Sequence, residues 1–225
     1  IGDNAFYDCS NLTSITIPAS TTTINEDSFR ETGLTSINIP DNVTSIGARA
    51  FLNCKSLTKA TLGNGITVIP AECFYGSALE NITIPDPVTR IGNSAFKYSG
   101  SLSNVNFGEN SQLNIIDSGA FSYCVGLKSI TIPKKVTKLN FAAFEKCKAL
   151  KNITFLSTTA PELDARVFES ISEDARFTAP DDSIGYGNIF GGILNANLVY
   201  SLTTESTTNG SITANETNFY HGATT

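Results

Sequence analysis

Cysteine recurs at one fixed place in this 225-residue sequence, and cysteine thiolates act both as zinc ligands and as nucleophiles. Each recurring cysteine stands three residues after a phenylalanine and three residues before a leucine. The positions are Cys9, Cys54, Cys124 and Cys147. This spacing raises two chemical hypotheses, a zinc site and a thiol active site.

The rest of the sequence argues against both hypotheses. Zinc sites join cysteines in C-x₂₋₄-C pairs, and no two cysteines here are that close. A cysteine nucleophile needs a base, and the only histidine is His221, near the end of the chain. Ser99 takes the cysteine position after Phe96, so this position requires a small side chain rather than a thiolate. We therefore expect free, buried and inert cysteines, with no metal and no cofactor.

Two further motifs resemble catalytic or binding sites only superficially. The run "GYGNIFGG" at 185–192 lacks the Lys-Ser/Thr of a phosphate loop, and no dinucleotide-binding strand precedes it. The paired carboxylates Glu26–Asp27, Glu173–Asp174 and Asp181–Asp182 are sequence neighbours, whereas a glycosidase needs two carboxyls facing each other across a sugar at about 5–10 Å. The sequence therefore predicts that the protein is not an enzyme.

Composition and charge restrict the class of protein. Hydrophobic residues make up 40% of the chain and charged residues 16%, which is typical of a folded domain. No apolar run approaches the roughly 18 residues that a membrane span needs. Residues 1–156 carry 13 basic and 12 acidic residues, whereas residues 157–225 carry 2 and 9, so nucleic acid is not an expected partner. The chain has no Met and no signal peptide, from which we expect a piece of a longer protein.

One local stretch is basic. Residues 128–151 contain seven lysines and one acid, Glu145. The lysines are Lys128, Lys134, Lys135, Lys138, Lys146, Lys148 and Lys151. A solvated face and a binding patch for an anionic partner both remain open.

The cysteines belong to an internal repeat with a period of 22–25 residues. The repeated phenylalanines are Phe6, Phe29, Phe51, Phe74, Phe96, Phe121, Phe144 and Phe168. A leucine follows each of the first seven phenylalanines at 5–6 residues, and an Ile-x-Ile pattern follows three residues after that leucine. Each unit has the approximate form I-G-x-x-A-F-x-x-C-x-x-L-x-x-I-x-I-P-x-x-V-T-x.

This pattern predicts the structure of one unit. The Leu-x-x-Ile-x-Ile segment alternates as a half-buried strand does, with Ile15 and Ile17 inward in the first unit. Proline or glycine ends that strand, and Val-Thr-x-Ile, as at 43–46 and 88–91, forms a second short strand. The Ala-Phe segment is expected to form a helical or 3₁₀ turn, with phenylalanine in the interior.

A single unit cannot bury enough apolar surface to fold alone, so the units must stack. We expect a β-rich α/β solenoid of about eight rungs, one rung for each unit, with parallel strands. Cys124 and Cys147 would lie on neighbouring rungs about 4.8 Å apart. Because their side chains point the same way, we expect free thiols rather than a disulfide.

The stretches "IGDNAFYDCSNLTSITIP", "VTSIGARAFLNCKSLTKATL" and "VTRIGNSAF" resemble the BspA-type leucine-rich repeat. The resemblance is strong over residues 1–156 and continues weakly to about 180. It implies a secreted or cell-surface bacterial protein, often an adhesin, that binds host or matrix proteins without catalysis.

The repeat pattern weakens after Phe155, which divides the chain into three predicted regions. Residues 1–180 are the repeat solenoid with a degenerate last rung, and residues 181–203 are a C-terminal cap over the exposed solenoid end. Residues 204–225 are either a linker or the start of a β module. Their Asn-Gly hairpin signal in "TNGSIT" resembles the opening of an internalin-type B repeat.

The outward positions beside the inward isoleucines are the candidate ligand-binding residues, and we call them the sheet face. They are Ser14, Thr16, Ser36, Asn38, Lys59, Thr61, Asn81, Thr83, Asn104, Asn106, Ser129, Thr131, Asn152 and Thr154. Two interpretations remain open for these small polar side chains: cross-rung ladders that serve the fold, and a recognition strip. Tyr7, Tyr75, Tyr98 and Tyr123 recur one or two residues after the phenylalanine, where half-buried packing is expected.

The sequence thus predicts a non-catalytic binding or adhesion module of a secreted or surface protein. Its expected partner is an extracellular protein or a glycan, bound by a monomer through the sheet face. A structural spacer that holds other domains away from the cell surface is the alternative.

Overall fold

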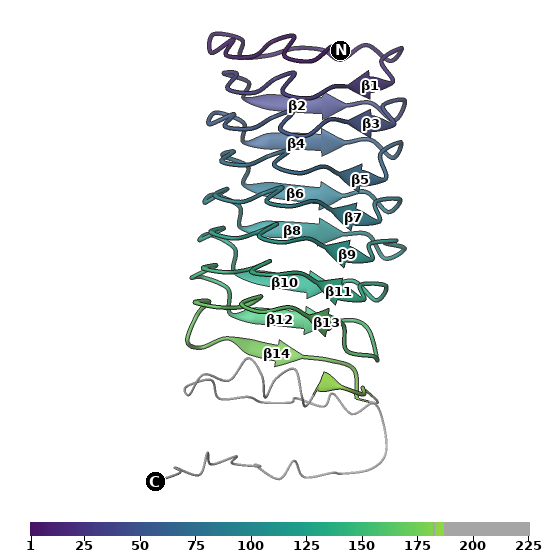
Figure 1. The fold of residues 1–225 in the computed structure, drawn as a ribbon, viewed down its shortest axis with the longest axis vertical. Helices are drawn as coiled ribbons and strands as arrows, with labels where there is room; N and C mark the ends of the chain where they lie inside the picture. The colour runs from purple at the N-terminus through teal and green to yellow at the C-terminus, as the bar shows by residue number, and fades with distance from the viewer. Residues whose placement is uncertain (182, 187–225) are drawn as a thin grey trace.

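The chain forms an elongated column of stacked rungs in a computed structural model that describes residues 1–181 and 183–186 (Figure 1). Beyond the first rung, most rungs carry one long and one short strand, and every strand pairs in parallel with its counterpart on a neighbouring rung. The long strands are β2 (Ser36–Ile39), β4 (Lys59–Leu62), β6 (Asn81–Ile84), β8 (Asn104–Phe107), β10 (Ser129–Ile132), β12 (Asn152–Phe155) and β14 (Arg176–Thr178). The short strands are β1 (Thr23–Ile24), β3 (Ser45–Ile46), β5 (Val68–Ile69), β7 (Arg90–Ile91), β9 (Ile115–Ile116), β11 (Lys138–Leu139) and β13 (Glu162–Leu163).

The predicted parallel-stranded solenoid is confirmed. The long strands form two sheets, in the orders β2-β4-β6-β8 and β10-β12-β14. The short strands form a separate pair, β1-β3, and a sheet in the order β13-β11-β9-β7-β5. Within the described residues, no helix is long and apolar enough to cross a membrane.

Alternation and strand-ending residues shape the long strands as predicted. In β2, Ile37 and Ile39 are buried while Ser36 and Asn38 are exposed. Pro40 follows β2 directly, and because proline has no N–H to give to the ladder, the strand ends there. The first rung departs from the prediction, since residues 14–17 form no strand although Ile17 is buried.

The interior is organised around a column of phenylalanine rings. Successive rings from the eight repeats stack nearly parallel, with centroids 5.0–5.4 Å apart and interplanar angles of 10° or less. Phe6 at the open end is half-buried, whereas Phe29 to Phe144 in the same column have no exposed surface. Each ring therefore fills the interior of its own rung and forms the floor of the next.

The predicted helical or 3₁₀ turns are not found. Each rung instead has a six-residue run of β-turns before its long strand, which we call the turn segment. The turn segments are residues 3–8, 26–31, 48–53, 71–76, 93–98, 118–123, 141–146 and 165–170. The second and sixth residues of every turn segment have positive φ, from 53° to 66°, which excludes a helix.

Hydrogen bonding between rungs explains this backbone. In the second rung the N–H groups of Asp27, Phe29 and Glu31 donate to carbonyls of the third rung at 3.1, 2.8 and 2.9 Å. Alternating peptide orientation lets every second N–H reach the neighbouring rung, whereas a helix would use these groups internally. Each non-glycine residue with positive φ costs about 1–2 kcal/mol, and the cross-rung bonds offset this cost.

Among the described residues, the long strands have one irregular step, between β8 and β10. These strands share contacts but belong to different sheets. The rung from Phe96 to Phe121 is 25 residues long rather than 22–24, and the extra residues fall in the loop 108–114 after β8. Most of the predicted cap at 181–203 and all of the tail at 204–225 lie outside the described residues.

Candidate functional site

The structure assembles the sheet face into two columns of side chains. Each column takes one residue from each long strand and runs across the strands, from rung to rung. One column passes from Ser36 through Lys59 and Asn81 to Asn104, and these residues pair directly across the ladder. All fourteen predicted residues point away from the core, and only Asn104 and Thr154 are half-buried rather than exposed.

Some members of the two columns interact with one another. The Nδ2 of Asn104 donates to Oδ1 of Asn106 at 3.0 Å, and the hydroxyl of Thr178 lies 3.0 Å from that of Thr154. Thr178 and Arg176 extend the two columns onto β14, and sequence reasoning missed both residues. The segment "RFTAP" at 176–180 resembles Ile-x-Ile-Pro, with Phe177 at the first inward position. This resemblance could have identified Arg176 and Thr178 as outward residues.

The step between β8 and β10 opens a hollow of about 440 Å³ on the sheet face. Four predicted residues line it, two from each side of the step: Asn104, Asn106, Ser129 and Thr131. A volume of this size lies within the range of small-ligand sites, roughly 300–1,000 Å³. Polar side chains from two neighbouring long strands therefore line one concave surface here.

The hollow also has lining residues that sequence reasoning did not place there. Gln112, Lys134 and Lys135 add polar groups, the carboxylate of Glu109 lies beside them, and Leu156 adds an apolar side chain that is 49% exposed. The Nζ of Lys135 donates to Oε1 of Gln112. Only the 25-residue spacing signalled an irregularity here, and it does not reveal where the extra residues bulge.

Gly108, which lines this hollow, lies in close contact with Asp86 on the neighbouring rung. A Cβ on Gly108 would stand 1.9 Å from Oδ1 of Asp86, so only glycine fits beside this carboxylate as it is placed. Oδ1 of Asp86 is buried and has no hydrogen-bond partner within the described part of the chain. A buried acceptor that the described part of the fold leaves without a hydrogen bond therefore lies next to Gly108.

The basic stretch at 128–151 is divided among several environments. Lys134 and Lys135 line the hollow and a second, adjoining hollow of about 470 Å³. Lys138 pairs with Glu162 at 2.9 Å, and Lys151 pairs with Asp174 at 3.3 Å. These four lysines therefore do not share one environment.

The recurring cysteines are scaffold residues that tie each rung to the one before it. The Sγ atoms of Cys54, Cys124 and Cys147 each donate to the carbonyl of the phenylalanine one rung back, at 3.0–3.1 Å. Ser99 makes the same bond to the carbonyl of Phe74 at 2.9 Å. The position thus requires a small hydrogen-bond donor, a role that the expectation of an inert hydrophobe missed.

Burial suppresses thiol chemistry at these positions. All five cysteines are free, as predicted, and only Cys9 is exposed. Burial raises the pKa of the Cys54, Cys73 and Cys124 thiols, and it raises the pKa of Cys147 to about 12. Across the described part of the chain, no group of three or more His, Cys, Asp or Glu residues is placed to hold a metal ion.

We expect a thiol reagent to modify one cysteine of the native protein rapidly and the other four only after unfolding. Raised pKa values keep the four buried thiols protonated through neutral pH, and burial also blocks the reagent. Counting reactive thiols with dithionitrobenzoate at pH 8, with and without denaturant, checks this. Rapid release from two or more native thiols would contradict the assignment, and Cys9→Ser, which should abolish the fast phase, is the control.

Comparison with known proteins agrees with this architecture. The family model described as the BspA-type leucine-rich repeat region matches residues 1–124 and 114–189. A leucine-rich cell surface protein from Faecalibacterium prausnitzii A2-165 is 27% identical, with a TM-score of 0.52 over 83% of this chain and 58% of that one. The chain thus spans little more than half of that protein.

A second solved structure has higher identity over a shorter region. A leucine-rich repeat protein from Bacteroides capillosus ATCC 29799 is 35% identical over 40% of this chain and 63% of that one, with a TM-score of 0.35. No curated protein matches significantly. The repeats, the stacked fold and the family match together show that the chain belongs to the BspA-type leucine-rich repeat family, and one solved structure that it resembles is that of a bacterial cell-surface protein.

Proposed function

We propose that this chain is a non-catalytic binding module of a secreted or cell-surface bacterial protein. It recognises an extracellular protein or glycan, as a monomer, through the sheet face. The observation that carries the proposal is the hollow between β8 and β10, where amide and hydroxyl side chains converge from two strands beside Lys134 and Lys135.

The chemistry of the sheet face favours a polar ligand. Its side chains are amides and hydroxyls with little charge, and large aromatic anchors of the kind that dominate tight protein interfaces are missing from its fourteen residues. Asn104, Asn106 and Gln112 offer both donors and acceptors, which suit the hydroxyl groups of a glycan. The protonated, buried thiols support a binding role rather than a catalytic one.

Binding of the purified chain to an array of matrix proteins and glycans tests the proposal. Introducing two acids into the hollow, Asn106→Asp with Thr131→Glu, is expected to weaken the detected interaction at least about tenfold, because each lost hydrogen bond contributes about 0.5–1.5 kcal/mol and the new charges must be desolvated. Both positions are exposed, so the melting temperature should remain unchanged.

The matched control places two acids on exposed threonines outside the sheet face, Thr22→Glu with Thr67→Glu. This variant should bind as the unmodified chain does. Silence of the unmodified chain across the whole array, or equal loss of binding in both variants, would count against the proposal.

The straight, elongated column supports the alternative role of a spacer (Figure 1). A spacer would retain adhesion of the full-length protein after the substitutions in the hollow. It would instead respond to deletion of two complete rungs, which shortens the column.

A further inference from the structure

Three tyrosines form a ladder beside the turn segments, away from the sheet face. We call Tyr75, Tyr98 and Tyr123 the tyrosine ladder. Their ring centroids are 5.4 Å apart from Tyr75 to Tyr98 and 4.6 Å apart from Tyr98 to Tyr123. Tyr98 is 45% exposed, the other two are half-buried, and Val125 next to the ladder is 44% exposed.

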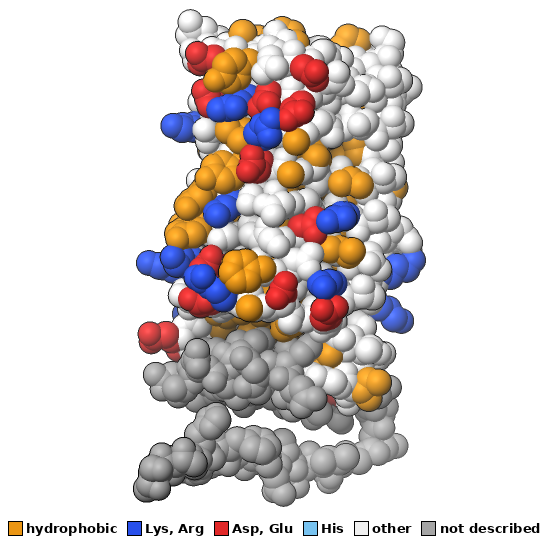
Figure 2. Space-filling model, in the orientation of Figure 1, with side chains coloured by type: hydrophobic (Ala, Val, Ile, Leu, Met, Phe, Trp, Pro, Cys, Tyr) orange, Lys and Arg blue, Asp and Glu red, His pale blue; other side chains and the backbone are white. Residues whose placement is uncertain are grey.

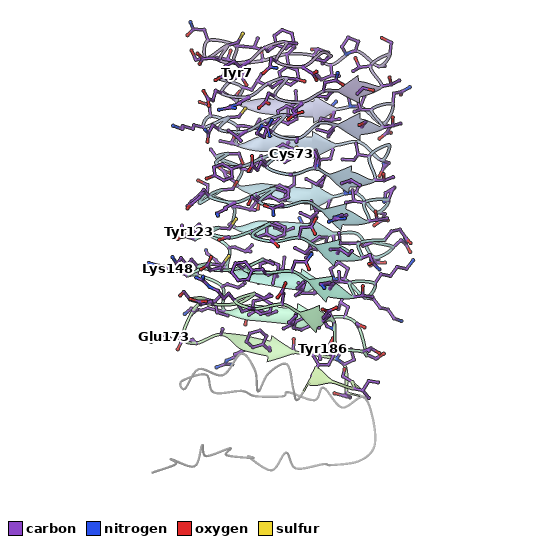
Figure 3. The ribbon with its side chains drawn as sticks, viewed as in Figure 1. Tyr7, Cys73, Tyr123, Lys148, Glu173 and Tyr186 are labelled. Carbon is purple, nitrogen blue, oxygen red and sulfur yellow. The ribbon has the colours of Figure 1, made fainter. Side chains whose placement is uncertain are left out.

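The position of the ladder in the molecule is visible in two views. Tyr123, Lys148 and Glu173 are labelled along one edge of the column in Figure 3, and Tyr7 lies inward of this edge near the N-terminal end. On this edge, hydrophobic and basic side chains lie side by side in Figure 2. The ladder therefore faces solvent as a strip that crosses three rungs.

The backbone under the ladder is unfavourable for tyrosine. Tyr98 and Tyr123 both have φ of 62° at the sixth residue of their turn segments. The other six rungs place no aromatic residue at this position, and three of them have residue types that tolerate positive φ well. The six residues are Asp8, Glu31, Asn53, Gly76, Lys146 and Ser170. The turn segment therefore does not require an aromatic residue at this position. Two adjacent rungs nevertheless have tyrosine there, although positive φ is unfavourable for a bulky side chain.

Basic groups accompany the rings. The Nζ of Lys97 lies 5.4 Å from the ring centroid of Tyr98, and the Nζ of Lys146 lies 4.7 Å from that of Tyr123. Lys146 also donates to the hydroxyl of Tyr123 at 2.6 Å. Lys148 is exposed one rung after Val125, at the equivalent position.

The nearby acids do not cancel this positive charge. Glu145 is buried and is paired with Arg166. Glu72 acts on Tyr75, where it contributes, after burial and Tyr98, to a raised pKa of the phenol. The exposed Glu173 lies further along the same edge, beyond Lys148 (Figure 3). Positive charge therefore predominates beside Tyr98 and Tyr123 themselves, which favours an anionic partner there.

We propose that the tyrosine ladder binds a linear polysaccharide that carries carboxylate groups. The apolar faces of successive sugars would pack on the exposed parts of Tyr75, Tyr98 and Tyr123, which repeat once per rung as sugars repeat along a chain. Carboxylates would pair with Lys97 and Lys146. This surface is separate from the sheet face and does not depend on the function proposed for it.

The shape of the strip favours a polysaccharide over a protein. Protein interfaces place their dominant anchors in well-packed pockets. Tyr75, Tyr98 and Tyr123 line neither of the two hollows described above. The ladder is therefore a strip on the surface and not part of either hollow. An acidic protein partner is the alternative, and the experiment separates the two.

Binding of the full chain to polygalacturonate, measured by isothermal titration calorimetry at low salt, tests the proposal. The double variant Tyr98→Asn with Tyr123→Asn should lose at least about tenfold in affinity. Because asparagine tolerates positive φ, as Asn53 shows, the melting temperature of this variant should stay the same or rise. Lys97→Gln with Lys146→Gln should also weaken binding and flatten its salt dependence.

Two controls make the result specific. Polyglutamate, which offers carboxylates without sugar faces, should bind at least tenfold more weakly than polygalacturonate. The hollow variant Asn106→Asp with Thr131→Glu should bind polygalacturonate as the unmodified chain does, so failure of the sheet-face function leaves this result intact.

Four outcomes would overturn the proposal: no binding of polygalacturonate, binding unaffected by the tyrosine substitutions, equal binding of polyglutamate, or a fall in melting temperature that accompanies the loss of binding. The last of these would show that the tyrosines serve the fold.

Discussion

Replacement of Phe96 with alanine is expected to destabilise the solenoid by about 3–5 kcal/mol, the usual cost of removing a fully buried aromatic ring. Phe96 has no exposed surface and stacks on Phe74 at 5.4 Å and on Phe121 at 5.1 Å. The substitution removes a ring that stacks on both of its neighbours in the column. Because both neighbouring rings are held in their own rungs, neither can move to fill the cavity. Urea unfolding followed by circular dichroism measures the change.

Phe6→Ala is the matched control for this substitution. Phe6 belongs to the same column but is half-buried, and among the described residues the only repeat ring that it stacks on is Phe29. Its replacement should therefore cost less than half as much as the replacement of Phe96. Equal effects of the two substitutions would contradict the idea that the ring column holds adjacent rungs together.

Gly47→Ala is expected to destabilise the chain by about 1–3 kcal/mol or more, because overpacking next to backbone cannot be relieved by side-chain movement. A Cβ at Gly47 would stand 2.3 Å from the backbone nitrogen of Glu26 and 2.5 Å from the carbonyl carbon of Asn25. The N–H of Gly47 also donates to the carbonyl of Ile24 at 2.7 Å, so the two rungs cannot separate without losing this bond.

The sequence supplies a control in the same repeat position. Gly2 follows Ile1 as Gly47 follows Ile46, but a Cβ at Gly2 would meet nothing within 4 Å. Gly2→Ala should therefore leave the urea midpoint within error of the unmodified chain. A similar loss from both substitutions would show that glycine is needed for its flexibility rather than for the close approach of the rungs.

The repeat made the architecture predictable because its signal is redundant. The phenylalanine, leucine and Ile-x-Ile positions share one period, and each set must face the same interior when rungs stack. Alternation in segments such as "SINI" also predicted which side chains point outward, and the exposure of Ser36 and Asn38 agrees.

The turn segments were not predictable from local pattern. "ARAFLNC" has the spacing of a short helix, yet Arg49 and Asn53 have positive φ. The deciding interactions are cross-rung hydrogen bonds, such as that from the N–H of Phe51 to the carbonyl of Cys73 at 2.9 Å. These bonds depend on the stacked neighbour, so a single unit carries no local signal for them.

The candidate site was only partly predictable for a related reason. The sheet face follows from strand alternation, but the hollow lies where β8 and β10 belong to different sheets, and part of the loop 108–114 lines it. Lys134 and Lys135, which follow β10, also line the hollow. The position of the loop is set by packing between rungs, which the sequence pattern does not encode.

Hydroxyl-radical footprinting of the chain, with and without the partner that the binding array identifies, tests the role of the sheet face most directly. Leu156 lines the hollow and is 49% exposed, whereas Val68 on β5 is 41% exposed and lies outside the sheet face. Both side chains should be oxidised in the free chain. We predict that bound partner protects Leu156 and leaves Val68 unprotected, whereas protection of Val68 with continued oxidation of Leu156 would contradict recognition through the sheet face.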